Sequence, residues 1–391
     1  MTARPMDIAP ARPVRLPDSG LGSGWEGPAI LGLTLLLLSL GLVTLYSASS
    51  VLAMRQGSPD TYYVLRQAAG AVVGLAAMIG CALMPYKRWE RWSWPLLWLS
   101  VVMLVVIILP GTEAIAPEIN GARRWLQIGI TIQPSDFAKI SVIVWTAAMA
   151  VKKAPHFDSL RNGLGPFFVV WSLVLIPIAL EPDLSTAVLI GILGVMVVFA
   201  AGARIAHFVF LGLLVVPVFL NQLAVGFRQD RIDAYLNPAL DPAGAGFQLR
   251  QSLVALGSGG LTGVGFGEGR QKFGFLPEAH NDFIFAMVGE EWGLLGVVLL
   301  LSIYMAIVLV GFRIASRAPD MFGELLAVGF TTFIALQAVL HMAVGLGLVP
   351  TTGLALPLLS YGRSNLVVTL ASLGILMSVA RAAPGGKAAR A

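Results

Sequence analysis

The stretch QKFGFLPEAHNDFIFAMVGEEWGLLG, residues 271–296, passes from a charged, proline-containing segment into a long apolar run. Its ionisable side chains are Lys272, Glu278, His280, Asp282, Glu290 and Glu291. Charge beside hydrocarbon costs free energy, so such residues in a membrane protein indicate a functional site. The alternative is that these side chains lie at the end of a membrane helix and snorkel to the membrane–water interface. This alternative explains any single one of these residues well, but it explains all six together less well.

Asp282 is the strongest candidate for chemistry in this stretch. It is followed directly by Phe283, Ile284 and Phe285, at the predicted junction between a helix and water. Partly apolar surroundings raise the pKa of a carboxyl group toward the value of a useful general base. We therefore predict that Asp282 is catalytic.

The composition indicates a polytopic membrane protein. Of the 391 residues, 57% are hydrophobic and 12% are charged, whereas soluble domains carry about a quarter charged residues. The net charge of +5 is explained by basic cytoplasmic connections, so we do not expect nucleic-acid binding. The single Cys81 excludes a disulfide framework, and four scattered histidines argue against a zinc motif.

The hydrophobic pattern predicts an all-α fold with about ten transmembrane helices, because a spanning helix needs about 20 residues. We expect a cytoplasmic tail at residues 1–27, a membrane domain at 28–382 and a cytoplasmic tail at 383–391, with a long extracytoplasmic loop at 226–281 between the seventh and eighth helices. The first tail is expected to be disordered. The predicted spans are residues 29–53, 62–84, 92–109, 136–151, 165–180, 184–201, 205–225, 282–312, 323–346 and 365–381.

Four short basic connections set the expected orientation, since positively charged loops stay in the cytoplasm. Both termini are expected on the same side as these connections. The basic residues are Lys87, Arg88, Arg91, Lys152, Lys153, Arg161, Arg204, Arg313 and Arg317. Polar chemistry then gathers in the opposite, outward loops.

Cations in these outward loops indicate either membrane anchors or an anionic ligand. Arg123, Arg124 and Trp125 fit both interpretations: they suit headgroup depth, but arginine forks also suit phosphate oxygens. The long loop continues the basic series with Arg228, Arg231, Arg250, Arg270 and Lys272. Glycines at 263, 265 and 267 lack a preceding strand, so we interpret them as a flexible hinge rather than a nucleotide motif.

Charged residues that fall inside predicted spans include Lys139 and Glu290 or Glu291, and Arg66 near the start of the second span. At this depth they are expected to pair or to line a polar cavity, and a structural ion pair is at least as good an explanation as catalysis. Together, the carboxylate and the cations favour displacement at a sugar-phosphate carbon of a lipid-linked substrate.

The chain closely resembles the SEDS family, the shape, elongation, division and sporulation proteins. FLPEAHNDFIFA at 275–286, followed by Gly289-Glu-Glu291, carries the resemblance. Further motifs in the family's order are NGARRW at 120–125, QPS at 133–135, EPDLSTA at 181–187, GFQ at 246–248 and LPLLSYG at 356–362. Pro-Glu-Ala-His and Gly-Glu-Glu are more similar to the division branch than to the elongation branch.

The resemblance implies a ten-helix peptidoglycan glycosyltransferase of the bacterial inner membrane, which polymerises lipid II at the division septum. It implies inversion at the anomeric carbon, a class B penicillin-binding protein and other division proteins as partners, and Asp282 as the essential residue. Whether a divalent cation, Mg²⁺ or Mn²⁺, bridges the diphosphate stays open. The implied substrate-binding residues are Arg123, Arg124, Trp125, Lys272, Glu278, His280, Ser360 and Arg363.

Four positions depart from the family pattern: Asp136 replaces Glu, Asn281 replaces Thr, His341 replaces Asn, and Arg363 replaces the second glycine of a Ser-Tyr-Gly-Gly turn. At Arg363 a side chain disfavours positive φ, so either the turn differs or the guanidinium binds phosphate. Two other functions compete: a flippase that moves lipid II across the membrane along intramembrane charges, and a catalytically silent division scaffold.

Overall fold

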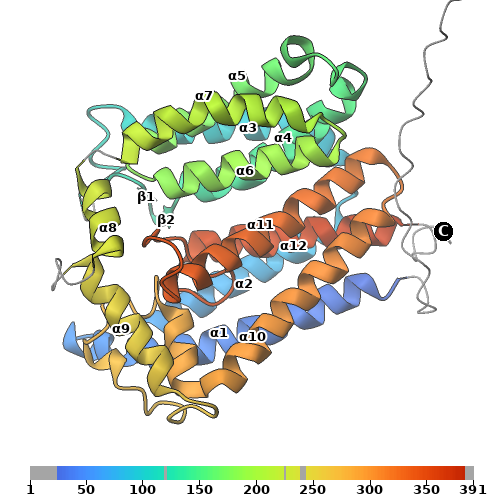
Figure 1. The fold of residues 1–391 in the computed structure, drawn as a ribbon. Helices are drawn as coiled ribbons and strands as arrows, with labels where there is room; N and C mark the ends of the chain where they lie inside the picture. Colours follow the sequence, from blue (N-terminus) through green and yellow to red (C-terminus); the bar gives the residue numbers. More distant parts are fainter. Residues whose placement is uncertain (1–23, 119–120, 224–225, 238–243, 384–391) are drawn as a thin grey trace, which may run out of the picture.

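The computed structural model describes residues 24–118, 121–223, 226–237 and 244–383 (Figure 1). The predicted tails therefore lie almost wholly outside the described residues, as does Asn120 of the NGARRW motif.

The ten predicted spans coincide with ten long helices of the described residues, which confirms the all-α membrane fold. Seven helical segments in this part of the chain are long and apolar enough to cross a membrane, and α6 is a shorter apolar helix. The ten are α1 (Glu26–Arg55), α2 (Tyr62–Leu83), α3 (Lys87–Ile108), α4 (Pro134–Lys153), α5 (Gly165–Leu180), α6 (Leu184–Ala200), α7 (Ile205–Leu223), α10 (Ile284–Ser316), α11 (Met321–Gly345) and α12 (Arg363–Ala382).

Two features of the connections were not expected. A short antiparallel hairpin, β1 (Leu126–Ile128) and β2 (Ile130–Ile132), turns at Gly129, whose φ is +73°. The long loop at 226–281 is partly helical, with α8 (Phe227–Leu236), α9 (Ala245–Ser258) and the 3-10 turn η3 (Gln271–Phe273). Two further short helices, η1 (Ala154–His156) and η2 (Leu160–Leu164), join α4 to α5.

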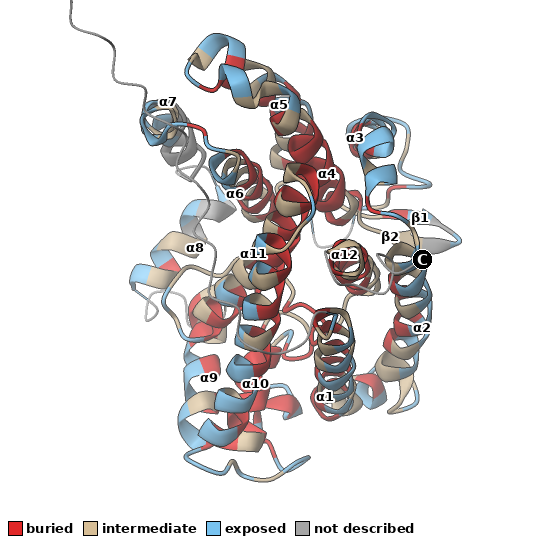
Figure 2. Ribbon diagram, turned by 90° about the vertical axis from the view of Figure 1, so that its right-hand side faces the viewer, coloured by how far each residue is buried: buried red, intermediate tan, exposed pale blue. Residues whose placement is uncertain are grey.

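Helices α4, α11 and α12 form the buried centre of the molecule (Figure 2). Because α4 is covered by protein along most of its length, it carries polar residues that a lipid-facing helix excludes. Glycines let α2 and α12 approach closely. A Cβ at Gly74 would lie 2.4 Å from Leu370 Cδ1, and one at Gly374 would lie 2.3 Å from the Met78 carbonyl oxygen.

The four basic connections lie at one end of the bundle, together with the start of α1 and the end of α12 (Figure 1). Lys87 pairs with Asp320 at 3.3 Å, which joins two of these connections, and Arg204 pairs with Asp158 at 2.6 Å, which joins the other two. The hairpin, α8 and α9 lie at the opposite end. This separation is the one that the charge pattern predicts.

Helix α10 occupies the predicted span at 282–312, and it is broken at Gly293 (φ +65°, ψ −162°), a feature that the hydrophobic pattern did not predict. The glycine-rich segment at 259–269 fills the break. Val264 and Gly265 donate to the carbonyls of Glu290 and Glu291 at 3.0 and 3.2 Å. A Cβ at Gly263 would lie 2.2 Å from the Glu291 carbonyl oxygen. These glycines therefore permit close backbone contact, and the flexible hinge stays a prediction.

Candidate active site

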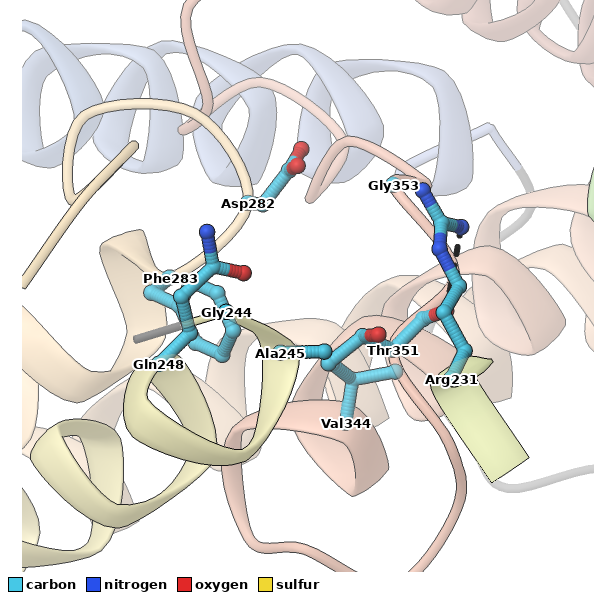
Figure 3. Close-up of a pocket in the computed structure, with 9 residues that line it drawn as sticks. All are labelled: Arg231, Gly244, Ala245, Gln248, Asp282, Phe283, Val344, Thr351 and Gly353. Atoms are coloured by element: carbon cyan, nitrogen blue, oxygen red, sulfur yellow. Dashed lines mark hydrogen bonds between the residues drawn. The ribbon is translucent and has the colours of Figure 1, made fainter. Parts of the chain in front are cut away.

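A cavity of about 230 Å³ lies beside Asp282, at the end of the bundle opposite the basic connections (Figures 1 and 3). Its walls come from α8, from α9 and the residue before it, from the start of the α10 segment, from α11 and from the segment before α12. The lining residues are Arg231, Gly244, Ala245, Gln248, Asp282, Phe283, Val344, Thr351 and Gly353. An acid, a guanidinium and an amide are the main polar side chains among them.

The Asp282 carboxylate faces this cavity from one side, and the Arg231 guanidinium lies on the other (Figure 3). Burial raises the pKa of Asp282 to about 6, and the negative charge of Glu278 adds to the shift. The positive charges of Arg231 and Arg124 oppose it. At neutral pH the carboxylate is therefore mostly ionised and able to accept a proton, as a general base requires.

The loop that carries Asp282 is held by the segment before α12. Ser360 Oγ donates to the Asn281 carbonyl at 2.7 Å, and the Tyr361 amide donates to the His280 carbonyl at 3.1 Å. Gln67 on α2 donates through Nε2 to the Ser360 carbonyl at 3.0 Å. Ser360, predicted to bind substrate, is buried and has these backbone partners, so its observed contacts position the loop.

His280 and Glu278 lie on the same loop but in different surroundings. The buried His280 ring packs against the rings of Tyr63 and Tyr361, with centroids 4.9 and 5.8 Å away, and burial lowers the pKa of His280. Glu278 is exposed and adopts a left-handed backbone with φ +52°. Its carboxylate acts on Asp282 and His280 through charge.

The predicted basic residues of the hairpin loop separate in the structure. Arg124 donates to the carbonyls of Glu181 and Pro182 at 3.2 and 2.6 Å, and its charge reaches Asp282. Arg123 instead pairs at 2.7 Å with the exposed Glu113. Trp125 is half-buried. Of the three, Arg124 is the residue that acts on the cavity.

Lys272 belongs to a different cluster, away from the cavity lining. It is buried, pairs with Glu291 at 3.2 Å, and donates to Ser47 Oγ at 3.0 Å and to the Gly267 carbonyl. The cluster joins η3 to α1 and to the broken part of α10. Its observed partners make Lys272 a structural brace.

The three predicted intramembrane charges have different outcomes. Lys139 is buried, pairs with Asp136 at 2.8 Å and donates to Gln337 at 3.0 Å, which confirms the expected pairing. Glu290 accepts hydrogen bonds from the Arg270 and Gln271 amides at 2.8 and 3.3 Å.

The prediction of a buried charge at Arg66 was wrong. Its side chain is exposed near the start of α2 and lies 4.5 Å from the centre of the Tyr62 ring. At the first turns of a helix a long cation reaches water, so the residue needs no buried partner.

The departures from the family pattern are accommodated locally. Arg363 is the first residue of α12 and does not have positive φ, so a glycine-only turn is absent at this position; its side chain covers Gly70. Asp136 receives hydrogen bonds from Lys139 and Asn365. The His341 Nδ1 lies 2.7 Å from the Leu354 carbonyl and so holds the segment that contributes Gly353 to the cavity.

Sequence analysis did not single out Arg231 or Gln248. Arg231 appeared there as one of several loop cations, of which the Arg228 side chain lies outside the described residues. Its guanidinium donates to the Thr351 carbonyl at 3.4 Å, and burial, followed by the charge of Arg124, lowers its pKa. The Gly-Phe-Gln motif at 246–248 was the only signal for Gln248.

The described residues contain no group of three or more histidine, cysteine, aspartate or glutamate side chains that could hold a metal ion.

Comparison with known proteins gives a consistent result. Residues 28–384 match the family model for FtsW, RodA and SpoVE, described as cell cycle proteins. A protein of Trichlorobacter lovleyi named "Probable peptidoglycan glycosyltransferase FtsW" is 40% identical over 90% of this chain and 92% of its own length. Stage V sporulation protein E of Bacillus subtilis is 42% identical over 89% of this chain and 95% of its own length.

Two solved structures have the same fold. A chain from the work described as "Structural coordination of polymerization and crosslinking by a peptidoglycan synthase complex" matches with a TM-score of 0.75 and 28% identity, over 92% of this chain and 98% of that one. Rod shape determining protein RodA of Thermus thermophilus matches with a TM-score of 0.67 and 28% identity, over 93% of this chain and 98% of its own.

Proposed function

Because this chain belongs to the SEDS family of FtsW, RodA and SpoVE cell cycle proteins, we propose that it polymerises lipid II into glycan strands during septal cell-wall synthesis. The class of enzyme rests on the relatives. Those named peptidoglycan glycosyltransferase are about 40% identical over most of the chain, so this chain is a peptidoglycan glycosyltransferase. The substrate, the catalytic base and the septal role are the proposed parts.

The observation that carries the mechanism is the Asp282 carboxylate facing a cavity that also holds a guanidinium. We assign Asp282 as the general base. It takes the proton from the acceptor sugar hydroxyl while the hydroxyl oxygen attacks the anomeric carbon of the donor. The bond from that carbon to the diphosphate oxygen breaks, and its electron pair leaves with the diphosphate. Attack opposite the leaving group inverts the anomeric carbon.

Arg231 and Arg124 are the cations proposed to stabilise the departing diphosphate. Negative charge develops on the leaving oxygens, and a preorganised guanidinium favours that charge more strongly in a partly buried site than in water. Gln248 supplies an amide that donates to sugar or phosphate oxygens. Glu278 lies on the same loop as Asp282, and its negative charge acts on both Asp282 and His280.

The proposed orientation places the cavity on the outer face of the bacterial inner membrane. The clustering of basic connections at the opposite end of the bundle supports it, and both termini are then cytoplasmic. A class B penicillin-binding protein is the proposed partner. The match to a chain of a peptidoglycan synthase complex supports such a partnership.

The flippase alternative receives less support from the charged residues. It requires a polar path through the membrane, which Arg66, Lys139 and Glu290 suggested. Arg66 is exposed near a helix end, Lys139 is paired, and Glu290 is bound by backbone amides. The local partners of these three charges therefore give the flippase no specific support.

Assays of polymer formation, lipid II movement and cell division distinguish the glycosyltransferase, the flippase and the scaffold. Purified protein with its penicillin-binding partner receives labelled lipid II while penicillin blocks crosslinking, and glycan products are resolved on a gel. Polymer from wild type and none from Asp282→Ala is the expected result. In proteoliposomes, movement of labelled lipid II across the bilayer without polymer formation would support the flippase. The scaffold would be supported if the protein showed neither polymerisation nor lipid II movement and if cells that carry Asp282→Ala still divided.

A further inference from the structure

Glu181, between α5 and α6, is a buried acid without a visible partner. The residue is only 3% exposed, and neither of its carboxyl oxygens has a hydrogen-bond partner among the described residues. A buried carboxylate normally has donors around it, because an unpaired charge in a low-dielectric site is very costly. The arrangement suits an uncharged acid far better than an anion.

The neighbouring charged groups make different contacts. Arg124 donates to the main-chain carbonyls of Glu181 and Pro182, and forms no ion pair with the Glu181 carboxyl. Asp183 accepts from the Thr186 amide at 3.3 Å and caps the start of α6. Arg124 and Asp183 are the charged groups that face Glu181, from the hairpin loop and from α6 respectively.

We propose that Glu181 is a positioning residue that stays uncharged and thereby leaves the positive charge of the neighbouring Arg124 available to the diphosphate of a lipid-linked substrate. This inference rests on the proposed function. To the proposed function it adds Glu181, a residue outside the cavity lining, whose protonation state sets the charge that the substrate meets.

Charge balance around the cavity carries this inference. Arg124, Arg231, Asp183 and Asp282 lie near enough to affect one another: Arg124 acts on Asp282, and both Asp183 and Asp282 act on Arg231. Within this buried or partly buried group, two cations balance two anions. Glu278, whose negative charge also acts on Asp282, is exposed, so water and salt screen its charge more strongly. An ionised Glu181 would add an unbalanced negative charge beside Arg124, in a site that has to receive an anionic group.

The titration of Glu181 agrees with this geometry. Burial, with the nearby charge of Asp183, raises its pKa to about 9, and Arg124 opposes the shift only in part. Glutamine has nearly the same shape and no charge, so it reproduces the uncharged acid at neutral pH and cannot ionise at high pH. Glu181→Gln is therefore the informative variant.

The test measures the affinity of purified protein, in complex with its penicillin-binding partner, for undecaprenyl diphosphate as a function of pH. Wild type is expected to lose about tenfold in affinity between pH 8 and pH 10 as one negative charge appears, whereas Glu181→Gln loses little. At pH 7 the two proteins should bind within about twofold of each other. Glu113→Gln, which removes an exposed acid of the hairpin loop, is the matched control and should follow wild type.

Equal loss of affinity at high pH in wild type and Glu181→Gln would overturn the inference, as would a loss of more than about tenfold for Glu181→Gln at pH 7 when thermal unfolding shows that it is folded. Absence of binding by wild type would overturn it as well. Polymerisation of lipid II is measured in parallel. Binding with the expected pH dependence but no polymer from wild type would retain the role of Glu181 and reject the proposed glycosyl transfer.

Discussion

Arg231 and Asp282 face each other across one cavity, and each stabilises the charged form of the other (Figure 3). The charge of Arg231 lowers the pKa of Asp282, and the charge of Asp282 raises that of Arg231. A base and a cation held apart by an open space can act on two ends of one reaction. One accepts the proton of the nucleophile, and the other stabilises the anionic leaving group.

The rate of polymerisation should fall in acid because Asp282 must be ionised to act as a base. Its raised pKa of about 6 places the loss below that pH. At pH 5 the rate should be about tenfold below its plateau. Initial rates of polymer formation at saturating lipid II, from pH 4.5 to 8, provide the measurement.

Glu278→Gln is the matched variant for this pH profile. The negative charge of Glu278 raises the pKa of Asp282, so its removal should lower that pKa and extend activity to lower pH. A shift of the acid limb in the opposite direction, or no acid limb in wild type, would contradict the assignment of Asp282 as the titrating base.

Arg231→Ala should reduce kcat/KM for lipid II by about 100-fold, because it removes a cation that stabilises the departing diphosphate. It should also shift the acid limb to higher pH, since Arg231 lowers the pKa of Asp282. Arg123→Ala, which removes an exposed ion pair with Glu113, should change kcat/KM by no more than about twofold. Equal effects of the two substitutions would mean that Arg231 has no special place in the reaction.

Gly263→Ala should destabilise the protein by about 3 kcal/mol or more, because its Cβ would meet the Glu291 carbonyl at the break in α10. Gly267 has a similar φ of +80° but open space around it, so Gly267→Ala should cost only about 1 kcal/mol. Thermal unfolding in detergent compares the two variants. Similar melting temperatures would show that the glycine-rich segment does not pack against α10 in the way described.

Lys139→Met should destabilise the protein by about 3 kcal/mol or more, since it leaves the buried Asp136 without its counter-charge. Adding Asp136→Asn to this variant should recover a large part of the loss, because the unpaired charge is then gone. Unfolding midpoints of the single and double variants test this. A single variant as stable as wild type would indicate that the pair contributes little to the fold.

The helices and their order followed from hydrophobic patterning, because a spanning segment must be long, apolar and continuous. A hydrophobic pattern does not reveal a break in a helix when another segment of the chain forms hydrogen bonds with the backbone groups at that break. Gly293 sits within an apolar run, and its freed backbone groups are satisfied by residues about thirty positions earlier, where glycines permit the approach. The hairpin at Leu126–Ile132 was missed for a similar reason, since two three-residue strands carry too little alternation to be recognised.

The candidate site was partly predictable. Asp282 stood out because an acid beside aromatic residues at a helix start is costly without a purpose. Arg231, Gln248 and Glu181 did not, since their importance depends on which loops fold together over the cavity. Conversely, Lys272 and Ser360 carry polar groups in family motifs, and the structure gives both of them protein partners. Residue type alone cannot distinguish a ligand contact from such a brace.

The most direct test of the account compares the rate of lipid II polymerisation by wild type, Asp282→Asn and Glu278→Gln, each bound to the penicillin-binding partner. Both substitutions remove one carboxylate from the same loop, and only Asp282 lines the cavity. The account predicts that Asp282→Asn loses at least about 1,000-fold in rate while retaining lipid II binding, and that Glu278→Gln stays within about tenfold of wild type at pH 7. Polymer formation by Asp282→Asn at a rate near wild type would contradict the central claim.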